Sequence, residues 1–95
     1  MIKVKQLANN QFIVKEGDVQ YFQSYDSIIA KRLADTNAYI EPTKTLLFLD
    51  KTYWNYSKTT SKYRNQFLGE TTKETQAKID SGEYVLTDLN AWNPI

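Results

Sequence analysis

The sequence lacks cysteine and histidine altogether, and it has only three glycines. Without cysteine the chain can form no disulfide, no thiolate metal site and no cysteine nucleophile. Without histidine it lacks the commonest general base and the commonest neutral metal ligand. The glycines stand at predicted turns and helix ends, not in a phosphate-binding loop, and the carboxylates are scattered singly. We therefore expect a protein that is not an enzyme and that uses no metal or other cofactor.

Long apolar runs are missing as well. The longest of them, Leu46–Leu49, is far too short to cross a bilayer. Residues 1–6 alternate in polarity and contain no apolar segment of the kind that directs secretion. A secreted domain of this size often needs disulfides, which this chain cannot form. We therefore expect a cytoplasmic location and no contact with a membrane.

What is present fits one globular domain. The chain has 95 residues, of which 41% are hydrophobic and 24% charged, an ordinary composition for a folded protein. We predict a single domain over residues 1–95. Aromatic residues make up 14% of the chain, which is a high share for its length. The rings either fill the core or form a contact surface, and the composition leaves both interpretations open.

The first half of the chain has the two-residue period of β-strands. Asn9–Asn10 and Gly17 separate the apolar segments, and these residue types suit the positive φ of tight turns. The predicted strands cover residues 2–7, 11–15, 19–25, 28–33 and 45–49. In the third strand, Tyr21 and Tyr25 are expected on one face. The segment 28–33 also fits a helical turn, but a strand is the preferred interpretation.

The period changes in the second half. A ring-rich stripe at helical spacing is expected to dock on the sheet, and it consists of Tyr56, Thr60, Tyr63 and Phe67. Ser57 or Thr60 is the expected N-cap of this helix, and Gly69 follows its end. A capping-box pattern over Thr71–Glu74 begins a second helix, which Gly82 ends. Residues 84–86 form a short extended segment.

Together these patterns predict an α+β fold, with an antiparallel β-meander of four to five strands followed by two short helices. The exposed edges of such a sheet also offer a route to a homodimer. The sequence leaves the oligomeric state open.

Three segments of the chain are distinctive: residues 21–31, residues 54–69 with the pattern Trp-x-Tyr-Ser-x-Thr-Thr-x-x-Tyr-x-x-x-Phe-Leu, and residues 78–84 with 88–90. These segments resemble those of a family of small uncharacterised phage and mobile-element proteins. The resemblance implies a viral or mobile-element origin, and hence the cytoplasm of the infected or carrying cell. It implies no activity, because none is established for the family as a whole. The stretch 34–45 is longer here than the short turn that is usual in the family.

One block of the sequence is basic, although the whole chain has a net charge of only +1. Residues 43–64 hold five lysines or arginines and one acid, whereas residues 65–95 hold two lysines and five acids. The basic block mixes cations with hydroxyls and aromatic rings, as phosphate contact and base stacking require. The candidate nucleic-acid-binding residues are Lys51, Tyr53, Trp54, Lys58, Lys62 and Arg64.

The basic block also has a simpler interpretation. Lys58 and Lys62 are expected opposite the docking stripe, where they form the solvated face of an ordinary amphipathic helix. Arg64 is expected on the other flank of the helix. The two interpretations differ in whether Lys58, Lys62 and Arg64 share one exposed surface.

A second set of rings is a candidate protein-binding surface, and it consists of Tyr21, Tyr25 and Trp92. Tyrosine and tryptophan join an apolar body to a polar tip, which suits interfaces. The simpler interpretation is that the tyrosines line one strand face and belong to the core. The sequence therefore predicts a non-catalytic binding module whose partner is nucleic acid. The alternative is an accessory factor that binds or inhibits a host protein of defence or replication.

Overall fold

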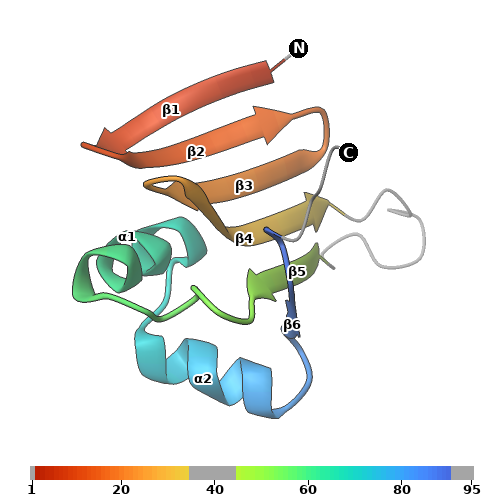
Figure 1. Ribbon diagram of the computed structural model, residues 1–95. Helices are drawn as coiled ribbons and strands as arrows, with labels where there is room; N and C mark the ends of the chain where they lie inside the picture. The colour runs from red at the N-terminus through yellow and green to blue at the C-terminus, as the bar shows by residue number, and fades with distance from the viewer. Residues whose placement is uncertain (1, 35–44, 91–95) are drawn as a thin grey trace.

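A computed structural model describes residues 2–34 and 45–90 of the protein (Figure 1). Six strands form one sheet in the order of the sequence. They are β1 (Ile2–Ala8), β2 (Gln11–Glu16), β3 (Val19–Ser24), β4 (Ser27–Ala34), β5 (Thr45–Asp50) and β6 (Val85–Thr87). Strands β1 to β5 pair antiparallel. The α+β class is therefore confirmed, and so is the antiparallel meander of its first part.

The sheet has six strands and not the predicted four to five. The additional strand is β6, because the extended segment expected at residues 84–86 joins the sheet after both helices. It runs parallel to β5, as a strand does when the chain returns through a helical crossover. Only three residues of β6 pair with β5, which is too few for a two-residue period to reveal a strand.

Two of the hairpin turns have the predicted conformation. Asn10 has a φ of 63° and Gly17 a φ of 59°, both in the left-handed region. The turn after β3 differs, because β3 ends before Tyr25, which itself has a φ of 55°. Tyr25 therefore lies in a turn and does not share a strand face with Tyr21, so that prediction is wrong. The backbone N–H of Tyr25 donates to Asn10 O at 2.7 Å and joins the two turns.

Helix α1 (Lys58–Leu68) and helix α2 (Thr72–Asp80) lie where their caps predict. Of the two expected N-caps of α1, it is the hydroxyl of Ser57 that accepts a hydrogen bond, from Thr60 N at 3.1 Å. Gly69 ends α1 with a φ of 71°, and α2 begins with the predicted capping box. In the part of the chain that the structure describes, neither helix is long and apolar enough to cross a membrane.

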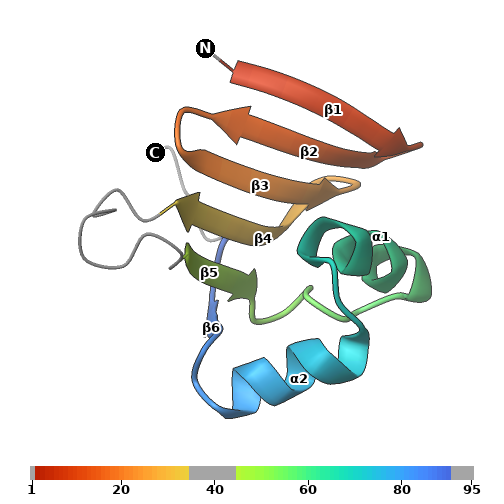
Figure 2. The same cartoon turned by 180° about the vertical axis from the view of Figure 1, so that it is seen from behind.

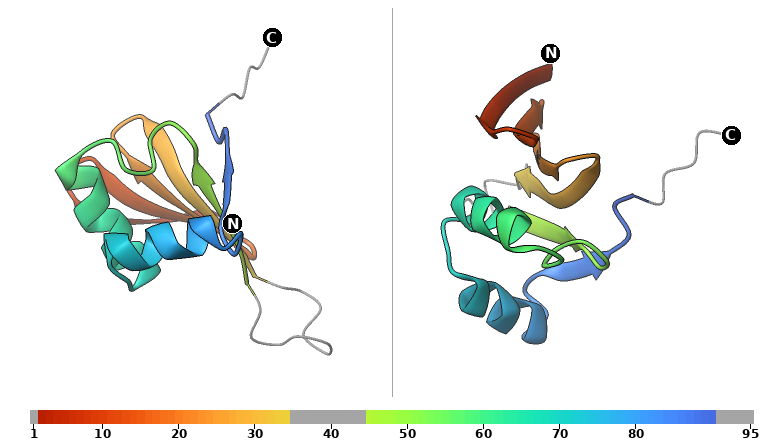
Figure 3. Two further views of the ribbon diagram at one scale, coloured as in Figure 1. Left: turned by 90° about the horizontal axis from the view of Figure 1, so that it is seen from below. Right: turned by 60° about the vertical axis from the view of Figure 1, so that its left-hand side comes forward.

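The core lies where α1 packs on the sheet. Phe67 of α1 stacks on Phe22 of β3, with ring centroids 6.0 Å apart. Burial of a side chain of this size stabilises the fold by about 1.5–3 kcal/mol. The other buried apolar residues are Ile29, Ala30, Leu47 and Leu49. Seen from behind, β1 lies at the end of the sheet away from both helices (Figure 2), and the strands twist strongly with respect to one another (Figure 3).

The stripe of α1 that docks on the sheet is only partly the predicted one. Thr60 and Phe67 are buried, and Tyr63 packs against the core. Tyr56 precedes the helix and is 50% exposed, so its predicted place in the stripe is wrong. Arg64 is buried beside the stripe instead, with none of its surface exposed.

Two side chains tie the segment after β6 to earlier strands. The side-chain amide of Asn90 accepts a hydrogen bond from Ile28 N at 2.8 Å and donates one to Ile28 O at 2.9 Å, as a paired strand residue does. The carboxylate of Asp50, at the end of β5, accepts the backbone N–H of Leu89 at 2.8 Å. Both β4 and β5 are therefore held by residues 39 or more positions later in the sequence.

Candidate functional site

The loop between β5 and α1 is held by Asp50. One carboxylate oxygen accepts the backbone N–H groups of Thr52 and Tyr53 at 3.1 and 2.8 Å, and the other accepts that of Leu89. Asp50 is 1% exposed, and these bonds compensate for the burial of its charge. The one acid of the basic block thus accepts hydrogen bonds from backbone groups.

Arg64 lies in the interior and not on the exposed flank of α1 where it was expected. Its guanidinium donates to the carbonyl oxygen of Trp54, and to Thr72 Oγ1 at 2.8 Å. The guanidinium carbon lies 5.0 Å from the centroid of the Trp54 ring, and the side chains of Asn55 and Asn65 accept further hydrogen bonds. Burial lowers the pKa of Arg64, but a guanidinium stays charged in proteins.

These contacts correct the prediction for Arg64. Residues 54–55 fold back over the flank of α1 and provide carbonyl and amide acceptors for Nη1 of the buried guanidinium, whereas its Nε has no hydrogen-bond partner among the described residues. Arg64 therefore fastens the loop to α1 and to the start of α2, and the ring of Trp54 covers its guanidinium. Lys58, Lys62 and Arg64 do not share one exposed surface.

Three of the other candidates are exposed, namely Lys51, Lys58 and Lys62. Lys62 Nζ lies 5.2 Å from the centroid of the Tyr63 ring on its own helix. Tyr53 is half-buried against the core. Its ring meets that of Tyr56 edge to face, with centroids 5.4 Å apart. The contact fixes the Tyr56 ring while leaving half of that residue exposed.

A hollow of about 390 Å³ opens at the first turn of α1. The residues that line it, called the helix-start hollow below, are Asn55, Tyr56, Ser57, Lys58 and Ser61. Lys58 is the one member that the sequence analysis named as a candidate. Tyr56 was not predicted as a site residue, because helical spacing was extended back to it although it precedes the N-cap. The position of Tyr56 before Ser57 was the signal for an exposed ring.

The helix-start hollow lies at the positive end of a helix dipole. The first N–H groups of a helix have no partner within the helix and carry partial positive charge. The first turn of α1 contains no acidic residue, and Lys58 is its first residue. Ser61 Oγ donates to Asn55 Oδ1 at 2.5 Å, which orients one wall of the hollow. The arrangement favours a negatively charged group held beside an aromatic ring.

The candidate protein-binding residues are not gathered in one place. Tyr21 is half-buried on the sheet face away from α1, because the neighbouring Phe22 points toward α1 and successive side chains alternate. Tyr25 lies in the turn after β3 and is 45% exposed. Trp92 lies outside the described residues.

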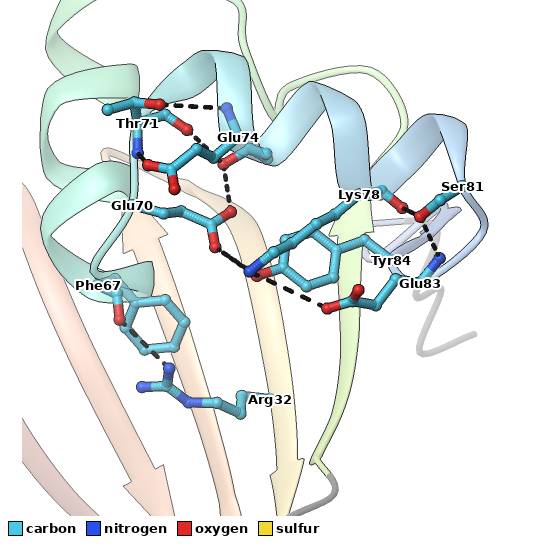
Figure 4. Close-up of polar contacts among 10 residues, drawn as sticks. Arg32, Phe67, Glu70, Thr71, Glu74, Lys78, Ser81, Glu83 and Tyr84 are labelled. Atoms are coloured by element: carbon cyan, nitrogen blue, oxygen red, sulfur yellow. Dashed lines mark hydrogen bonds and ion pairs between the residues drawn. The ribbon is translucent and has the colours of Figure 1, made fainter.

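A second polar cluster joins α2 to the segment before β6 (Figure 4). The carboxylate of Glu70 accepts hydrogen bonds from Lys78 Nζ and Tyr84 OH, both at 2.8 Å. It also accepts one from Thr75 Oγ1 at 2.6 Å. We call this set of four residues the Glu70 clasp. It connects the α1–α2 junction with both the body of α2 and the approach to β6.

The protonation of the clasp follows from these bonds. Burial by itself raises the pKa of Glu70, but the hydrogen bonds from Lys78, Thr75 and Tyr84 outweigh it, and the pKa is lowered. Burial, together with the hydrogen bond to Glu70, raises the pKa of Tyr84 to about 12. The hydrogen bond to Glu70 raises the pKa of Lys78. All three groups keep their ordinary charge at neutral pH, which suits a structural contact and not proton transfer.

The profile of a family of unknown function (DUF8033) matches residues 1–83. The chain belongs to this family. No curated protein and no solved structure matches it.

The DUF8033 match contains the whole helix-start hollow and Arg64, whereas β6 and Tyr84 of the clasp follow its last residue. The expected membership of an uncharacterised family is thereby confirmed. DUF8033 is a family of unknown function, so the geometry of this chain is what points to its function.

Proposed function

We propose that this protein is a non-catalytic binding module for single-stranded nucleic acid, and that the helix-start hollow is its contact. The observation that carries the proposal is the pairing of a half-exposed ring, Tyr56, with a cation, Lys58, at a helix start without acidic residues. A phosphate is stabilised by the ammonium group and by the helix dipole. A base stacks on the exposed face of the ring, which is possible only when it is unpaired.

The remaining exposed cations of the basic block extend this contact. Lys51 lies in the same loop as Tyr56, and Lys62 lies one turn after Lys58 on α1. Both are long, exposed side chains that reach phosphates without fixed geometry. Arg64 supports the site indirectly, because it holds the loop that presents Tyr56.

The resemblance to phage and mobile-element proteins extends the proposal to the biological setting. The motif that begins at Trp54 and ends at Leu68 contains both Tyr56 and the N-cap Ser57 of the hollow. We place the protein among products of phages or mobile elements, acting in the cytoplasm of the carrying cell. Single-stranded nucleic acid arises there whenever such elements replicate or are transcribed.

The test is fluorescence anisotropy with a labelled single strand and the matching duplex, over a series of salt concentrations. We expect the single strand to bind more tightly, with log K falling linearly as log salt rises. Tyr56→Ala is expected to weaken binding by about 5- to 150-fold, the loss of one stacked base, without changing the salt slope. Lys58→Gln is expected to reduce the slope by about 0.7.

The control for both variants is Lys73→Gln, which removes an exposed lysine from α2. It is expected to leave affinity and slope unchanged. No binding of either oligonucleotide at low salt would falsify the proposed function. Equal losses from the Lys73 and Lys58 variants would show that only net charge matters.

A second candidate function is the binding of a host protein, and one observation favours it. Tyr25 combines 45% exposure with a left-handed backbone, which is uncommon for a bulky residue. Such conformations cost about 1–3 kcal/mol and occur at binding sites more often than elsewhere. A photo-crosslinking amino acid at position 25, with position 73 as control, distinguishes the two functions. A protein adduct formed only from position 25 supports this candidate, and its absence counts against it.

A further inference from the structure

Three lysines outside the basic block lie on one face of β1 and β2, and we call Lys3, Lys5 and Lys15 the lysine face. Lys3 is directly opposite Lys15, and Lys5 is directly opposite Ile13. Lys15 is in turn opposite Gln20 of β3. Residues that lie opposite each other share a sheet face, so the three ammonium groups point to the same side.

That side is the one on which α1 packs. Ile13 is opposite Phe22, and Phe22 stacks on Phe67 of α1. One strand further on, Gln20 is opposite Arg32. The Arg32 guanidinium bonds Gln20 Oε1 at 2.9 Å and lies 4.2 Å from the centroid of the Phe67 ring. A row of positive side chains therefore leads from the edge of the sheet to the end of α1.

The lysine face is hollowed, and no acid from residues 2–34 or 45–90 lines the hollow. A cavity of about 450 Å³ is lined by Lys3, Val4, Lys5, Ile13, Lys15 and Gln20. No acidic side chain is among these residues, and the three lysines are exposed. The chain has a net charge of only +1, yet three cations surround this one hollow. The electrostatic potential there is therefore more positive than the average potential over the protein surface.

Protection of a sheet edge does not account for this arrangement. Lysines are common on edge strands, where they discourage pairing with another chain, and that role suits Lys3 and Lys5 of β1. Lys15 lies on β2, which is paired on both sides. There it faces Lys3 directly, and like charges in opposite positions destabilise a sheet. An anion held between the two removes that repulsion.

We infer that the lysine face is a second anion-binding site, which takes the phosphodiester backbone of the strand that the helix-start hollow binds. The inference rests on the proposed function for the class of its ligand. Among the described residues, none with an aromatic ring lines this hollow, so its contact is with phosphates and not with bases, and it is independent of sequence. Tyr56 stacks with a base, and the lysines of the lysine face neutralise most of the phosphate charge.

The two sites lie toward opposite ends of α1. Thr60, near the start of the helix, bonds Ser24 at 2.9 Å, whereas Phe67, near its end, accepts a bond from Arg32 at 3.3 Å. A helix of 11 residues spans about 16 Å. At about 3.4 Å for each nucleotide of a fully stacked strand, at most about five nucleotides connect the sites. Affinity should therefore rise between oligonucleotides of about three and about nine residues, and the rise should depend on the lysine face.

The experiment compares two double variants with equal loss of charge. Lys3→Gln/Lys15→Gln alters the lysine face, and Lys31→Gln/Lys73→Gln alters the opposite sheet face and α2. With a nine-residue oligothymidine, the first variant is expected to reduce the salt slope by about 1.4, from two lost phosphate contacts at about 0.7 each. It should also abolish the gain over the three-residue oligonucleotide. The second is expected to change neither.

Lys15→Glu separates loss of binding from loss of folding. It replaces a repulsive cross-strand pair with an attractive one, so it should raise the melting temperature while weakening the binding of the nine-residue strand. A variant that binds as tightly as the wild type overturns the inference. So does an unchanged salt slope in Lys3→Gln/Lys15→Gln, even where Tyr56→Ala and Lys58→Gln behave as proposed.

Titration with inorganic tripolyphosphate, followed by NMR of the backbone amides, tests the site without nucleic acid. We expect shifts at residues 3, 5 and 15 that are lost in Lys3→Gln/Lys15→Gln. If these shifts occur but no oligonucleotide binds, the proposed function fails, and nucleic acid is overturned as the occupant of this site. Absence of the shifts overturns the anion site itself.

Discussion

The two helices follow each other in the chain but differ in how their ends are charged. Helix α2 has Glu74 in its first turn, where it completes a capping box with Thr71, and Lys78 in its last turn. Both charges compensate the helix dipole, because an acid is favourable at the start of a helix and a base at its end. Helix α1 has no acid in its first turn and no base in its last, and it begins with Lys58. A helix that is not compensated at its own start is suited to an external anion.

The helices also differ in how they are attached. Helix α1 is attached by a buried arginine and by the stripe that docks on the sheet, of which Phe67 and Thr60 are the most enclosed members. Helix α2 has Thr75 buried and Ile79 partly buried against the core, and it is attached by Arg64 at its start and by the Glu70 clasp along its length. Attachment by a permanently charged guanidinium does not depend on pH, whereas attachment by a carboxylate does. The two helices therefore respond differently to acid.

The largest expected effect is that of Arg64→Ala, which detaches α1. It leaves the Trp54 carbonyl and Thr72 hydroxyl without their donor and opens a cavity. We expect a loss of about 3 kcal/mol in the free energy of unfolding, measured with urea. Lys62→Ala, at an exposed site on the same helix, should change it by less than about 0.5 kcal/mol. A loss below about 1 kcal/mol from Arg64→Ala would mean that α1 is held by its apolar stripe alone.

An intermediate effect is expected for Glu70→Gln, which weakens the attachment of α2. Because the folded-state pKa of Glu70 is lowered, its carboxylate stabilises the fold above its ordinary pKa, and this contribution disappears as the pH falls through the folded-state value. The variant should be less stable by about 2 kcal/mol at pH 7, and the difference should shrink below about pH 4. Thermal melts over that range measure it.

Two further measurements sharpen this result. Glu83→Gln removes an exposed carboxylate that lies 4.0 Å from Lys78, and it should have little effect at any pH. The stability lost in Arg64→Ala should stay constant over the same acidic range. A constant difference for Glu70→Gln would instead show that the clasp acts through packing and not through charge.

The smallest change in stability is expected for a substitution that gives the first turn of α1 an acid, as the first turn of α2 has. Thr59→Glu places an acid in the first turn of α1 and should stabilise the protein by about 0.3–1 kcal/mol. The same carboxylate should repel phosphate and abolish oligonucleotide binding at the helix-start hollow. Thr59→Gln has nearly the same shape without the charge and should change neither property. Undiminished binding by Thr59→Glu would show that the helix dipole of α1 does not contribute to oligonucleotide binding.

Local patterns were sufficient to predict most of the elements. Alternation over residues 2–33 locates four strands, although β1 is exposed on both faces and its apolar Ile2 and Val4 are 60% and 62% exposed. Cap residues such as Ser57 and Gly69 locate α1, because unpaired backbone groups at helix ends select particular side chains. The sequence did not predict that β6 joins the sheet, because its three residues acquire their conformation from pairing with β5.

The site was less predictable. It depends on contacts between residues that are distant in the sequence, and on residues whose solvent exposure or backbone conformation is unusual for their type. A charged residue on a helix flank is normally solvated, and only the fold of residues 54–55 brings acceptors to Arg64. Tyr25 is an unusual residue for a left-handed turn, so the bend was expected one position later. The lysine face arises from strand register, since residues 1–42 are neutral as a group.

The burial of Asp50 has a consequence for the order in which this chain folds. Its carboxylate needs the amide of Leu89, 39 positions later, and Ile28 needs the side chain of Asn90, 62 positions later. During synthesis, the meander β1–β3 is complete long before these partners leave the ribosome, so β5 acquires its final environment last. A chain cut after residue 83 would expose to water both the Asp50 oxygen that accepts the Leu89 amide and the edge of β5 that pairs with β6.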